Sequence, residues 1–494
     1  MIGTVAAVGF GAWALAVLLE GLILRQRPGR PSAAGLAGRL LAFGWLYGFW
    51  LSLWGEPGRA AFGALCTIGV MAGISTAKRL ILGEPLAFSD LGLVPLVLRF
   101  PRLYLLEGAG LWIFRAVVLG CVALVVLTQP SVPALSAVQR IAVLAGTALL
   151  LLGLPRLAAI GPLAAALRAR LPRPDADRSI RRHGLLLWMI LGWLRWAGDR
   201  TRAGAALPHD GPDAPLGPDL VVVVQLESFV DPVRAFGAAE PLPGLARARA
   251  RALAHGPLAV PAYGAFTMRT EHAVLTGLSD EELGFRRLDP YLARRGPAPP
   301  TLATRLAATG WHTLFMHPFP ARFFGRDRVV PRLGFAESHF LDRFAECRRI
   351  GPYVSDVDFA RRIVAEAAAS RRPTLIAAVT MENHGPFSPH RGIGPTEDAA
   401  QHGFHLRNTD AAIDVLVEGL AALPRRVLLC LWGDHPPILK GFPAGPPPVT
   451  DYAVLLLGKD TPPAAPSPAR PLSADALGRL LQRLVSPAEA GSSA

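Results

Sequence analysis

Five apolar stretches, each close to the length that crosses a lipid bilayer, lie in the first third of this chain. They cover residues 4–24, 39–55, 60–77, 111–129 and 138–155. A helix needs about 20 apolar residues to cross the bilayer core. Five such stretches in succession, joined by arginine-rich connectors, favour membrane helices over the buried core helices of a soluble protein. We therefore predict an α-helical transmembrane bundle of about five helices over residues 1–158.

A sixth apolar stretch, GLLLWMILGWLRWAG at 184–198, is shorter and contains Arg195. We predict a short membrane-associated helix or a sixth span there. This stretch lies in a connecting segment, 159–218, whose last part is the run TRAGAALPHDGPDAPLGP. A run rich in Pro, Gly and Ala is typical of a linker.

The positive charge of the chain is concentrated beside the apolar stretches. The net charge is +14, and arginine-rich runs occur at 25–30 and 178–182. Such positions suit contact with lipid headgroups, so we expect membrane association and no nucleic-acid binding. The four cysteines form no CxxC pair, which argues against a disulfide framework and against a thiolate metal site.

The same charge pattern bears on topology. Most Lys and Arg residues of the first half lie in the connectors 25–39, 78–110 and 156–183, which the positive-inside rule places in the cytoplasm. Six spans with an external N-terminus would then export the rest of the chain. Five spans with an internal N-terminus would also export it, against the charge bias. We expect a multi-pass protein of the plasma (inner) membrane with an extracytoplasmic C-terminal domain.

Beyond residue 218 the pattern changes to short apolar runs separated by helical stretches. The runs at 219–226, 312–316, 373–380, 426–432 and 452–458 are continuous rather than alternating, as in central strands buried on both faces. Helices are expected at 356–370 and 409–423. We predict an α/β/α sandwich over 219–460, followed by a C-terminal extension, 461–494, with a short helix at 473–485.

Polar side chains follow several of the predicted strands. Glu227 follows the first strand in QLESF, His384 follows the third in VTMENHGPF, and Asp434 and His435 follow the fourth in WGDHPP. In open α/β sheets, ligands bind at the carboxyl ends of the strands. With Thr267 in GAFTMRTEHAVLTG, these residues offer carboxylate, imidazole and hydroxyl groups. Such a set suits Mn²⁺, Mg²⁺ or Zn²⁺, which could activate the hydroxyl as a nucleophile.

From about 219 to 458 the chain resembles the sulfatase-like, alkaline-phosphatase-type hydrolases. More narrowly, it resembles the lipoteichoic acid synthase and periplasmic-glucan phosphoglycerol transferase family. The stretches that carry this resemblance are QLESF, the TEHAVLTG after Thr267, FMHPFPARFFGRDRVVPRLGF, VTMENHGPF and WGDHPP, all in the family's order. The apolar spans before the domain agree with the family's layout.

The resemblance implies a role for each matching residue. One divalent ion, with Mn²⁺ expected and Mg²⁺ or Zn²⁺ as alternatives, would be bound by Glu227, Thr267, Asp434 and His435. Thr267 would also be the nucleophile. The phosphoglycerol group would be held by His317, Phe324, Arg326 and His384. From the chemistry of the residues, His384 and His317 could also donate to phosphate oxygens or move the proton of the leaving alcohol, and we expect His384 to be catalytic. From the residues alone, Arg326 could instead pair with Asp327, and His317 could be a turn residue before Pro318.

Some positions depart from the family pattern. Phe324 stands where Trp or Tyr is usual, and Gly325 replaces a usual Asn. Ala265-Phe266 and Met268-Arg269 flank Thr267 in place of smaller or more polar residues. These departures bear on the substrate more than on the chemistry.

We therefore expect a membrane-bound transferase. It would move a phosphoglycerol-type headgroup from an anionic phospholipid donor to a glycan or lipid acceptor, through a phosphoryl-threonine intermediate. One alternative is a sulfatase or phosphodiesterase of the same fold, although no C-x-[PS]-x-R motif surrounds Thr267. A second alternative is a non-catalytic membrane sensor, although no candidate ligand is missing. The acceptor, the metal and the choice between phosphoglycerol and phosphoethanolamine remain open.

Overall fold

The computed structural model describes residues 2–25, 32–100, 119–120, 135–159, 161–199, 216–292, 300–387, 394–395, 397–439, 448–459, 461 and 467–485. The chain forms two compact units. The first contains Met1–Thr201 and Gly284–Leu288, and the second contains Arg202–Leu283 and Asp289–Ala494.

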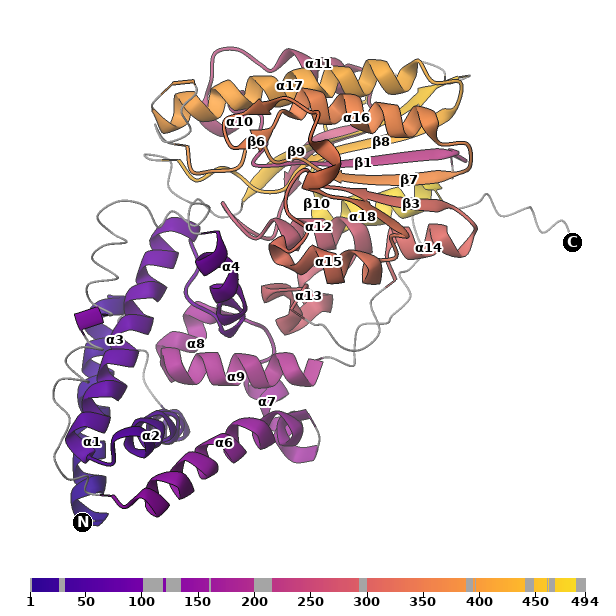
Figure 1. The fold of residues 1–494 in the computed structure, drawn as a ribbon. Helices are drawn as coiled ribbons and strands as arrows, with labels where there is room; N and C mark the ends of the chain where they lie inside the picture. Colours follow the sequence, from indigo (N-terminus) through magenta and orange to yellow (C-terminus); the bar gives the residue numbers. More distant parts are fainter. Residues whose placement is uncertain are drawn as a thin grey trace, which may run out of the picture. The chain divides into compact units, whose positions relative to one another are not determined.

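The first unit is helical. Four of its described helices are long and apolar enough to cross a membrane: α1 (Ile2–Leu24), α2 (Ala33–Trp54), α3 (Pro57–Leu82) and α6 (Ala137–Ala159) (Figure 1). These helices confirm four of the five predicted apolar spans. The fifth predicted span, 111–129, lies outside the described residues apart from 119–120.

The turn between α2 and α3 follows from its sequence. Gly55 ends α2 with a φ of 67°, a left-handed conformation that glycine adopts without a Cβ clash. The carboxylate of Glu56 then accepts hydrogen bonds from the backbone N–H groups of Gly58 and Arg59. Pro57 occupies the first turn of α3, where its missing N–H costs no helical hydrogen bond. The two long helices are thus joined by a very short connection.

The remaining elements of this unit are short. Helix α9 (Leu185–Gly198) has 14 residues, or about 21 Å, less than the roughly 30 Å bilayer core. Trp188 of α9 is buried against Phe285, with ring centroids 6.1 Å apart. The other short elements are η1 (Phe88–Leu93), α4 (Val94–Arg99), α7 (Gly161–Arg170), α8 (Ala176–His183) and η4 (Gly284–Leu288).

The second unit is built on an eight-stranded mixed sheet with the order β10-β2-β9-β8-β1-β7-β3-β4. Strand β1 lies between β7 and β8 and is parallel to both, and β3 is parallel to β7. The antiparallel strand β9 follows β8, and β2 is antiparallel to β9. The strands span Leu220–Leu226 (β1), Ala254–Ala259 (β2), His312–Met316 (β3), Glu337–His339 (β4), Thr374–Val379 (β7), Arg426–Gly433 (β8), Val449–Gly458 (β9) and Leu472–Ser473 (β10).

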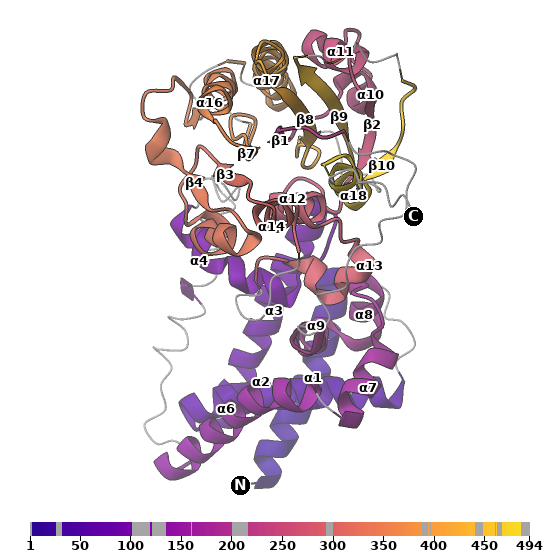
Figure 2. The same cartoon turned by 90° about the vertical axis from the view of Figure 1, so that its right-hand side faces the viewer.

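Helices cover both faces of this sheet, as predicted for an α/β/α sandwich. Helices α11 (Pro243–Ala250), α16 (Asp356–Ala369) and α17 (Asp398–Ala421) lie on one face (Figures 1 and 2). The other face carries α12 (Thr267–Thr276), α14 (Leu302–Ala308) and α18 (Ala474–Val485). The remaining short elements are α10 (Pro232–Phe236), α13 (Asp280–Leu283), α15 (Arg326–Val329), the 3₁₀ turns Phe323–Gly325, Val330–Leu333 and Leu341–Phe344, and the hairpin of β5 (Arg349–Ile350) and β6 (Tyr353–Val354).

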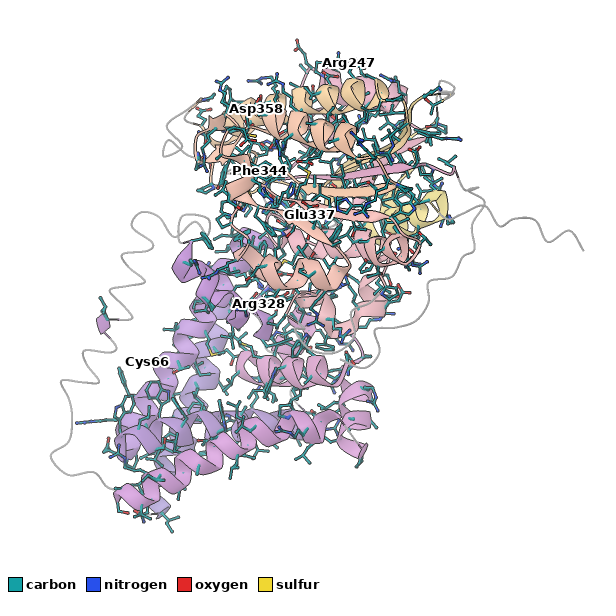
Figure 3. The ribbon with its side chains drawn as sticks, turned by 45° about the vertical axis from the view of Figure 1, so that its right-hand side comes forward. Cys66, Arg247, Arg328, Glu337, Phe344 and Asp358 are labelled. Carbon is teal, nitrogen blue, oxygen red and sulfur yellow. The ribbon has the colours of Figure 1, made fainter. Side chains whose placement is uncertain are left out.

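The core of the second unit lies between the sheet and the α11, α16 and α17 layer. Phe344 lies inside this layer and packs against Phe359 of α16, with ring centroids 5.2 Å apart (Figure 3). Arg247 of α11 lies on the outer side, where its guanidinium pairs with the carboxylate of Asp414. Every residue of β1 and β7 is buried, which explains their uninterrupted apolar sequences.

The structure corrects two details of the sequence prediction. Helix α17 begins at Asp398 rather than near 409, because its first turns bury the polar residues Gln401, His402 and His405 instead of an apolar stripe. Strand β2 was not predicted, since it contains Gly256 and Pro257, which are unfavourable in strands. At Gly256 a Cβ atom would lie 2.7 Å from the carbonyl oxygen of Arg470, so only glycine fits beside this neighbouring backbone.

Candidate active site

The ends of β1 and β8 bring two carboxylates together. Leu226, the last residue of β1, pairs in register with Gly433, the last residue of β8. Glu227 and Asp434 therefore leave the two strands at the same level, and the Asp434 N–H donates to the Leu226 carbonyl over 3.3 Å. A Cβ atom on Gly433 would lie 2.0 Å from the Phe229 carbonyl oxygen, so this close approach requires glycine.

Glu227, Asp434 and His435 form a buried cluster that could hold a metal ion. Each offers one ligand atom, and these atoms all lie within 4.8 Å of one another. His435 Nε2 is 3.5 Å from Glu227 Oε1 and 3.3 Å from Asp434 Oδ2. Two carboxylates and one imidazole are ligands that Mn²⁺, Mg²⁺ or Zn²⁺ accept. The donor set therefore fits a divalent cation.

The second nitrogen of His435 fixes the tautomer that metal binding requires. His435 Nδ1 is 3.2 Å from the carbonyl oxygen of Pro436, which can only accept a hydrogen bond. Nδ1 therefore carries the proton, and Nε2 presents its lone pair beside the two carboxylates. A carbonyl on the far side of a ligating imidazole is a common feature of metal sites.

The pKa values of Glu227 and Asp434 depend on their burial and on the charged and polar groups around them. Burial raises the pKa of Glu227 well above its usual value, and the charge of Asp434 raises it further. Burial also raises the pKa of Asp434, while His435, the Ser228 N–H and the facing Thr267 hydroxyl act in the opposite direction. Asp434 Oδ2 is buried and has no donor in hydrogen-bonding geometry among the described residues. A cation would compensate both the charge and this unpaired oxygen.

Ser228 holds this cluster together, although no role was predicted for it. Its hydroxyl donates to Glu227 Oε1 over 3.0 Å, and its N–H donates to Asp434 Oδ1 over 2.8 Å. Its carbonyl oxygen lies 3.1 Å from His402 Nε2. A single residue thus links both strand ends to helix α17. The only sequence signal was its place inside the QLESF motif.

Thr267 is the first residue of helix α12 and is buried beside this cluster. Its hydroxyl faces Asp434, and the neighbouring Thr270 hydroxyl donates to the Asp434 carbonyl oxygen over 2.6 Å. The first N–H groups of a helix and the positive end of its dipole favour bound anions. The hydroxyl therefore lies where both a cation and a helix N-terminus could stabilise a phosphate.

The backbone is strained where it presents these side chains. Among the described residues, Ser228, Phe266 and Phe324 are three of the four non-glycine residues with positive φ, at 48°, 63° and 51°. Ser228 follows Glu227, and Phe266 precedes Thr267. Phe324 and Gly325, with a φ of 63° for the glycine, precede Arg326. Such conformations are rare outside glycine and gather at functional sites.

His317 lies at the end of β3, fully enclosed, and not in an exposed turn. Its Nδ1 is 3.0 Å from the Val379 carbonyl oxygen, and its Nε2 is 3.1 Å from Arg326 Nη1. A carbonyl only accepts and a guanidinium only donates, so both contacts select the neutral tautomer with the proton on Nδ1. Burial lowers the pKa of His317 well below its usual value, and the charge of Arg326 lowers it further.

Arg326 does not pair with Asp327. Its guanidinium is buried and makes an ion pair with Glu271, whereas the Asp327 carboxylate lies 3.9 Å from Arg328. The Arg326 guanidinium also lies 5.6 Å from the Phe324 ring, a cation–π contact. The charge of Arg326 lowers the pKa of Glu227, so the arginine lies within electrostatic reach of the carboxylate cluster.

His384 follows β7 and is half-buried. Its Nδ1 is 2.6 Å from the Gly385 carbonyl oxygen, so Nδ1 donates and Nε2 can exchange a proton. A charge on His384 lowers the pKa of His317, which places the two imidazoles within electrostatic reach of one another. All eight residues singled out from the sequence lie in the second unit, either just after a strand or at the start of a short helix or in a 3₁₀ turn: Glu227, Thr267, His317, Phe324, Arg326, His384, Asp434 and His435.

Asp356 and Glu382, which lies two residues before His384, form a buried acidic pair. The N–H of Asp356 donates to Glu382 Oε2 over 2.8 Å, and Glu382 Oε1 lies 3.0 Å from His405 Nδ1. The Thr409 hydroxyl donates to Asp356 Oδ2 over 2.7 Å. Burial, followed by the negative charge of Glu382, raises the pKa of Asp356 to about 7.

Asp356→Asn should flatten the pH dependence of stability. The folded-state pKa of about 7 lies above the ordinary value of 3.8, so the folded protein binds this proton more tightly than the unfolded chain does. The proton on Asp356 therefore adds to the free energy of unfolding. This contribution is complete at low pH, decreases as the pH rises above about 4 and is lost once the pH passes 7. Above pH 7 the amide should stabilise the protein by up to about 4 kcal/mol, less one hydrogen bond that it cannot accept. Thermal unfolding of the full chain across this pH range measures the slope.

Asp358→Asn, two residues further along α16, is the matched control, since the Asp358 carboxylate is partly exposed and pairs with Arg361. It should keep the wild-type slope. Equal slopes for wild type and Asp356→Asn would contradict the assignment of this proton to Asp356.

The fold and this cluster define a class of protein. A mixed α/β sandwich, with two carboxylates and an imidazole that could hold a metal ion at the carboxyl ends of adjacent parallel strands and a hydroxyl at a helix N-terminus, agrees with the sulfatase-like fold expected from the motifs. The family model described as Sulfatase matches residues 219–463. The chain belongs to the sulfatase family, which confirms the resemblance drawn from its motifs at this level.

Two relatives come from Rhizobium meliloti (strain 1021). The capsular polysaccharide biosynthesis protein RkpI is 33% identical in an alignment 444 residues long, which covers 86% of this chain and 81% of that protein. A putative cyclic beta-1,2-glucan modification protein is 27% identical in an alignment 238 residues long, which covers 45% of this chain and 36% of that protein. The first of these matches extends over both the helical unit and the sulfatase domain.

A solved structure also aligns with nearly the whole chain. The integral membrane lipooligosaccharide phosphoethanolamine transferase EptA from Neisseria meningitidis aligns over 96% of this chain and 95% of its own, with a TM-score of 0.53 and 14% identity. At this identity the likeness concerns the fold. It matches apolar N-terminal helices followed by a sulfatase-like domain, as in the present chain.

Proposed function

We propose that this chain is a membrane-bound, metal-dependent transferase that moves a phosphoglycerol-type headgroup from an anionic phospholipid to a glycan or lipid acceptor. The observation that carries the proposal is the position of Thr267, which begins α12 and faces the Glu227, Asp434 and His435 cluster. The four membrane-length helices support a lipid donor, because such a donor is insoluble and stays in the bilayer.

In this proposal one divalent ion is held by Glu227, Asp434, His435 and Thr267. Manganese is the expected ion, with magnesium or zinc as alternatives. When bound, the ion would lower the pKa of the threonine hydroxyl and offset negative charge on the phosphoryl oxygens. The donor set and the unpaired Asp434 oxygen support this assignment.

The first half-reaction forms a phosphoryl-threonine. Thr267 Oγ1 attacks the phosphorus of the donor, and its hydroxyl proton passes to solvent. The bond between phosphorus and the diacylglycerol oxygen breaks, and that oxygen takes a proton from His384. Because His384 is half-buried and its Nδ1 is already bonded to a carbonyl, Nε2 is the atom that gives the proton.

The second half-reaction restores the enzyme. The acceptor hydroxyl gives its proton back to His384 as its oxygen bonds to phosphorus. The bond between phosphorus and Thr267 Oγ1 then breaks, and the threonine regains a proton from solvent. Arg326, His317 and Phe324 are assigned to holding the headgroup, with His317 acting through its hydrogen bond to Arg326. The positive charge of Arg326 would attract the phosphoryl group, and Phe324 would pack against its apolar part.

The comparisons favour a glycan as the acceptor. Of the two relatives, one is named for capsular polysaccharide biosynthesis and the other for modification of a cyclic glucan. The departures at Phe324 and Gly325 fall in the segment assigned to the headgroup, and phosphoethanolamine is therefore the headgroup to compare with phosphoglycerol.

Lipid and glycan analysis of cells with and without this protein tests the proposal. Cells that contain it should accumulate diacylglycerol and carry a phosphoglycerol-modified glycan. A glycan modified with phosphoethanolamine would instead identify phosphoethanolamine as the transferred headgroup. Released headgroup without a modified acceptor would identify a hydrolase, and unchanged lipids and glycans would contradict the transferase.

The domain that contains Thr267 should face away from the cytoplasm. The proposed acceptors lie outside the inner membrane. The positive-inside rule places the basic connectors of the first half in the cytoplasm. A reporter that is active only outside the cytoplasm, fused after Ala494, should therefore be active. A reporter that is active only in the cytoplasm should be silent at the same site, and the reverse result would overturn both the topology and the transferase assignment.

A further inference from the structure

Glu271 lies between the proposed nucleophile and the proposed phosphate-binding arginine. It is on helix α12, four residues after Thr267, so the two side chains share one face of the helix and are about 6 Å apart along its axis. Its Oε2 makes an ion pair with Arg326 Nη2. Its Oε1 accepts a hydrogen bond from the Tyr291 hydroxyl over 2.5 Å.

All members of this chain of contacts are buried. The side chains of Arg326 and Glu271 are 1% and 2% exposed. Beyond Arg326, Nη1 donates to His317 Nε2, and His317 Nδ1 donates to the Val379 carbonyl at the end of β7. The chain therefore connects α12, α15, β3 and β7 without an intervening exposed group. Glu271 at Nη2 and His317 at Nη1 together fix the plane of the Arg326 guanidinium.

A buried ion pair is a poor means of stabilising a fold. Removing two charges from water costs about as much as their attraction returns, and apolar replacements are often as stable. The pair at Glu271 instead gives orientation, since a planar guanidinium held at Nη2 by Glu271 and at Nη1 by His317 has a defined plane. The Nε–H of Arg326 is left without an acceptor among the described residues, although it is buried. A phosphoryl oxygen would satisfy this donor.

We propose that Glu271 is a positioning residue, which fixes the guanidinium of Arg326 and ties it to the helix that begins with Thr267. This inference rests on the proposed function, since it assigns Arg326 to an anionic group. Tyr291 supports it by occupying the second oxygen of Glu271. Burial, with the charge of Glu271, raises the pKa of Tyr291 well above its usual value, so the phenol stays protonated and donates.

The test compares phosphate binding in four full-length variants in detergent and manganese-containing buffer. The probe is inorganic phosphate, measured by titration calorimetry on Glu271→Gln, Arg326→Gln, the double variant and the control Arg425→Met. Glu271→Gln should weaken phosphate binding about tenfold, the loss expected for one charge-assisted hydrogen bond. In the double variant, phosphate should bind no more weakly than in Arg326→Gln, because Glu271 acts only through the arginine.

Arg425 is a suitable control because it lies at the opposite end of β1, where it bonds Asp219 and the Ser370 carbonyl oxygen. Its substitution should lower the unfolding temperature and leave phosphate affinity unchanged. If Glu271→Gln does not fold, Tyr291→Phe takes its place, with a smaller weakening of phosphate binding expected. A variant that melts earlier but binds phosphate normally would identify a purely structural role for Glu271.

The outcomes separate this inference from the proposed function. Phosphate binding that depends on Glu271, in a protein that releases no diacylglycerol, would overturn the transferase and keep the positioning role. Two results would overturn the positioning role. One is wild-type phosphate affinity in both Glu271→Gln and Tyr291→Phe. The other is a double variant whose loss of phosphate affinity equals the product of the two single losses. Absence of phosphate binding in the wild-type protein would also overturn it.

Discussion

Thr267→Ala should abolish headgroup transfer and leave the fold intact. Thr267 is the first residue of α12 and its hydroxyl faces the Asp434 carboxylate, whereas the nearby Thr270 hydroxyl donates to the Asp434 carbonyl oxygen. Removing a nucleophile from a hydrolytic site lowers turnover on the order of 10⁴-fold or more. Diacylglycerol release from phosphatidylglycerol by purified full-length protein measures the loss.

Two further variants control this experiment. Thr267→Ser keeps a hydroxyl on the same backbone and should retain measurable turnover. Thr276→Ala, at the other end of α12, removes a buried hydroxyl that donates to the His272 carbonyl oxygen. It should affect stability alone. Full activity in Thr267→Ala would remove the covalent mechanism.

Substitution of the proposed metal ligands should also abolish headgroup transfer. It should in addition remove the stabilisation of the folded protein by manganese. Glu227 and Asp434 are buried carboxylates whose ligand atoms lie within 4.8 Å, and a cation would relieve their repulsion. A ligand at about 100 times its Kd stabilises the folded state by about 2.7 kcal/mol. Manganese should therefore raise the unfolding temperature of the wild-type protein, and a chelator should reverse the increase and stop turnover.

In the Asp434→Asn variant, manganese should neither raise the unfolding temperature nor support turnover. Without manganese the variant should unfold at a temperature no lower than that of the metal-free wild type, because one of two repelling carboxylates is gone. Asp358→Asn on the outer side of α16 is the control and should respond to manganese as the wild type does (Figure 3). A manganese response that survives in Asp434→Asn would place the metal elsewhere in the molecule.

The central part of the fold and the cluster could be predicted because short segments determine them. Strands β1, β7 and β8 are continuous apolar runs, which central parallel strands require. Once these runs are neighbouring parallel strands, Glu227 and Asp434 must meet at their ends. Thr267 could not be placed in this way, since a threonine before a helix has many ordinary uses. Its assignment came from the resemblance.

The partners of the predicted residues could not be read from the sequence. Arg326 pairs with Glu271, 55 positions away, and not with its neighbour Asp327. Such contacts depend on how α12 and α15 lie against β3, which local patterns do not encode. Strand β2 was missed for a related reason. Its Gly256 and Pro257 contradict strand propensity, and the neighbouring Arg470 backbone explains the glycine only once the sheet is assembled.

The most direct test of the proposed transferase is to identify the atom that carries the headgroup. Full-length protein, reconstituted with manganese and with phosphatidylglycerol labelled in the headgroup phosphate, is quenched before an acceptor is added. Mass spectrometry of its peptides should then place the label on Thr267, with one diacylglycerol released for each labelled protein and no label in Thr267→Ala. Diacylglycerol release without labelled protein, or a label on any other residue, would contradict the phosphoryl-threonine mechanism.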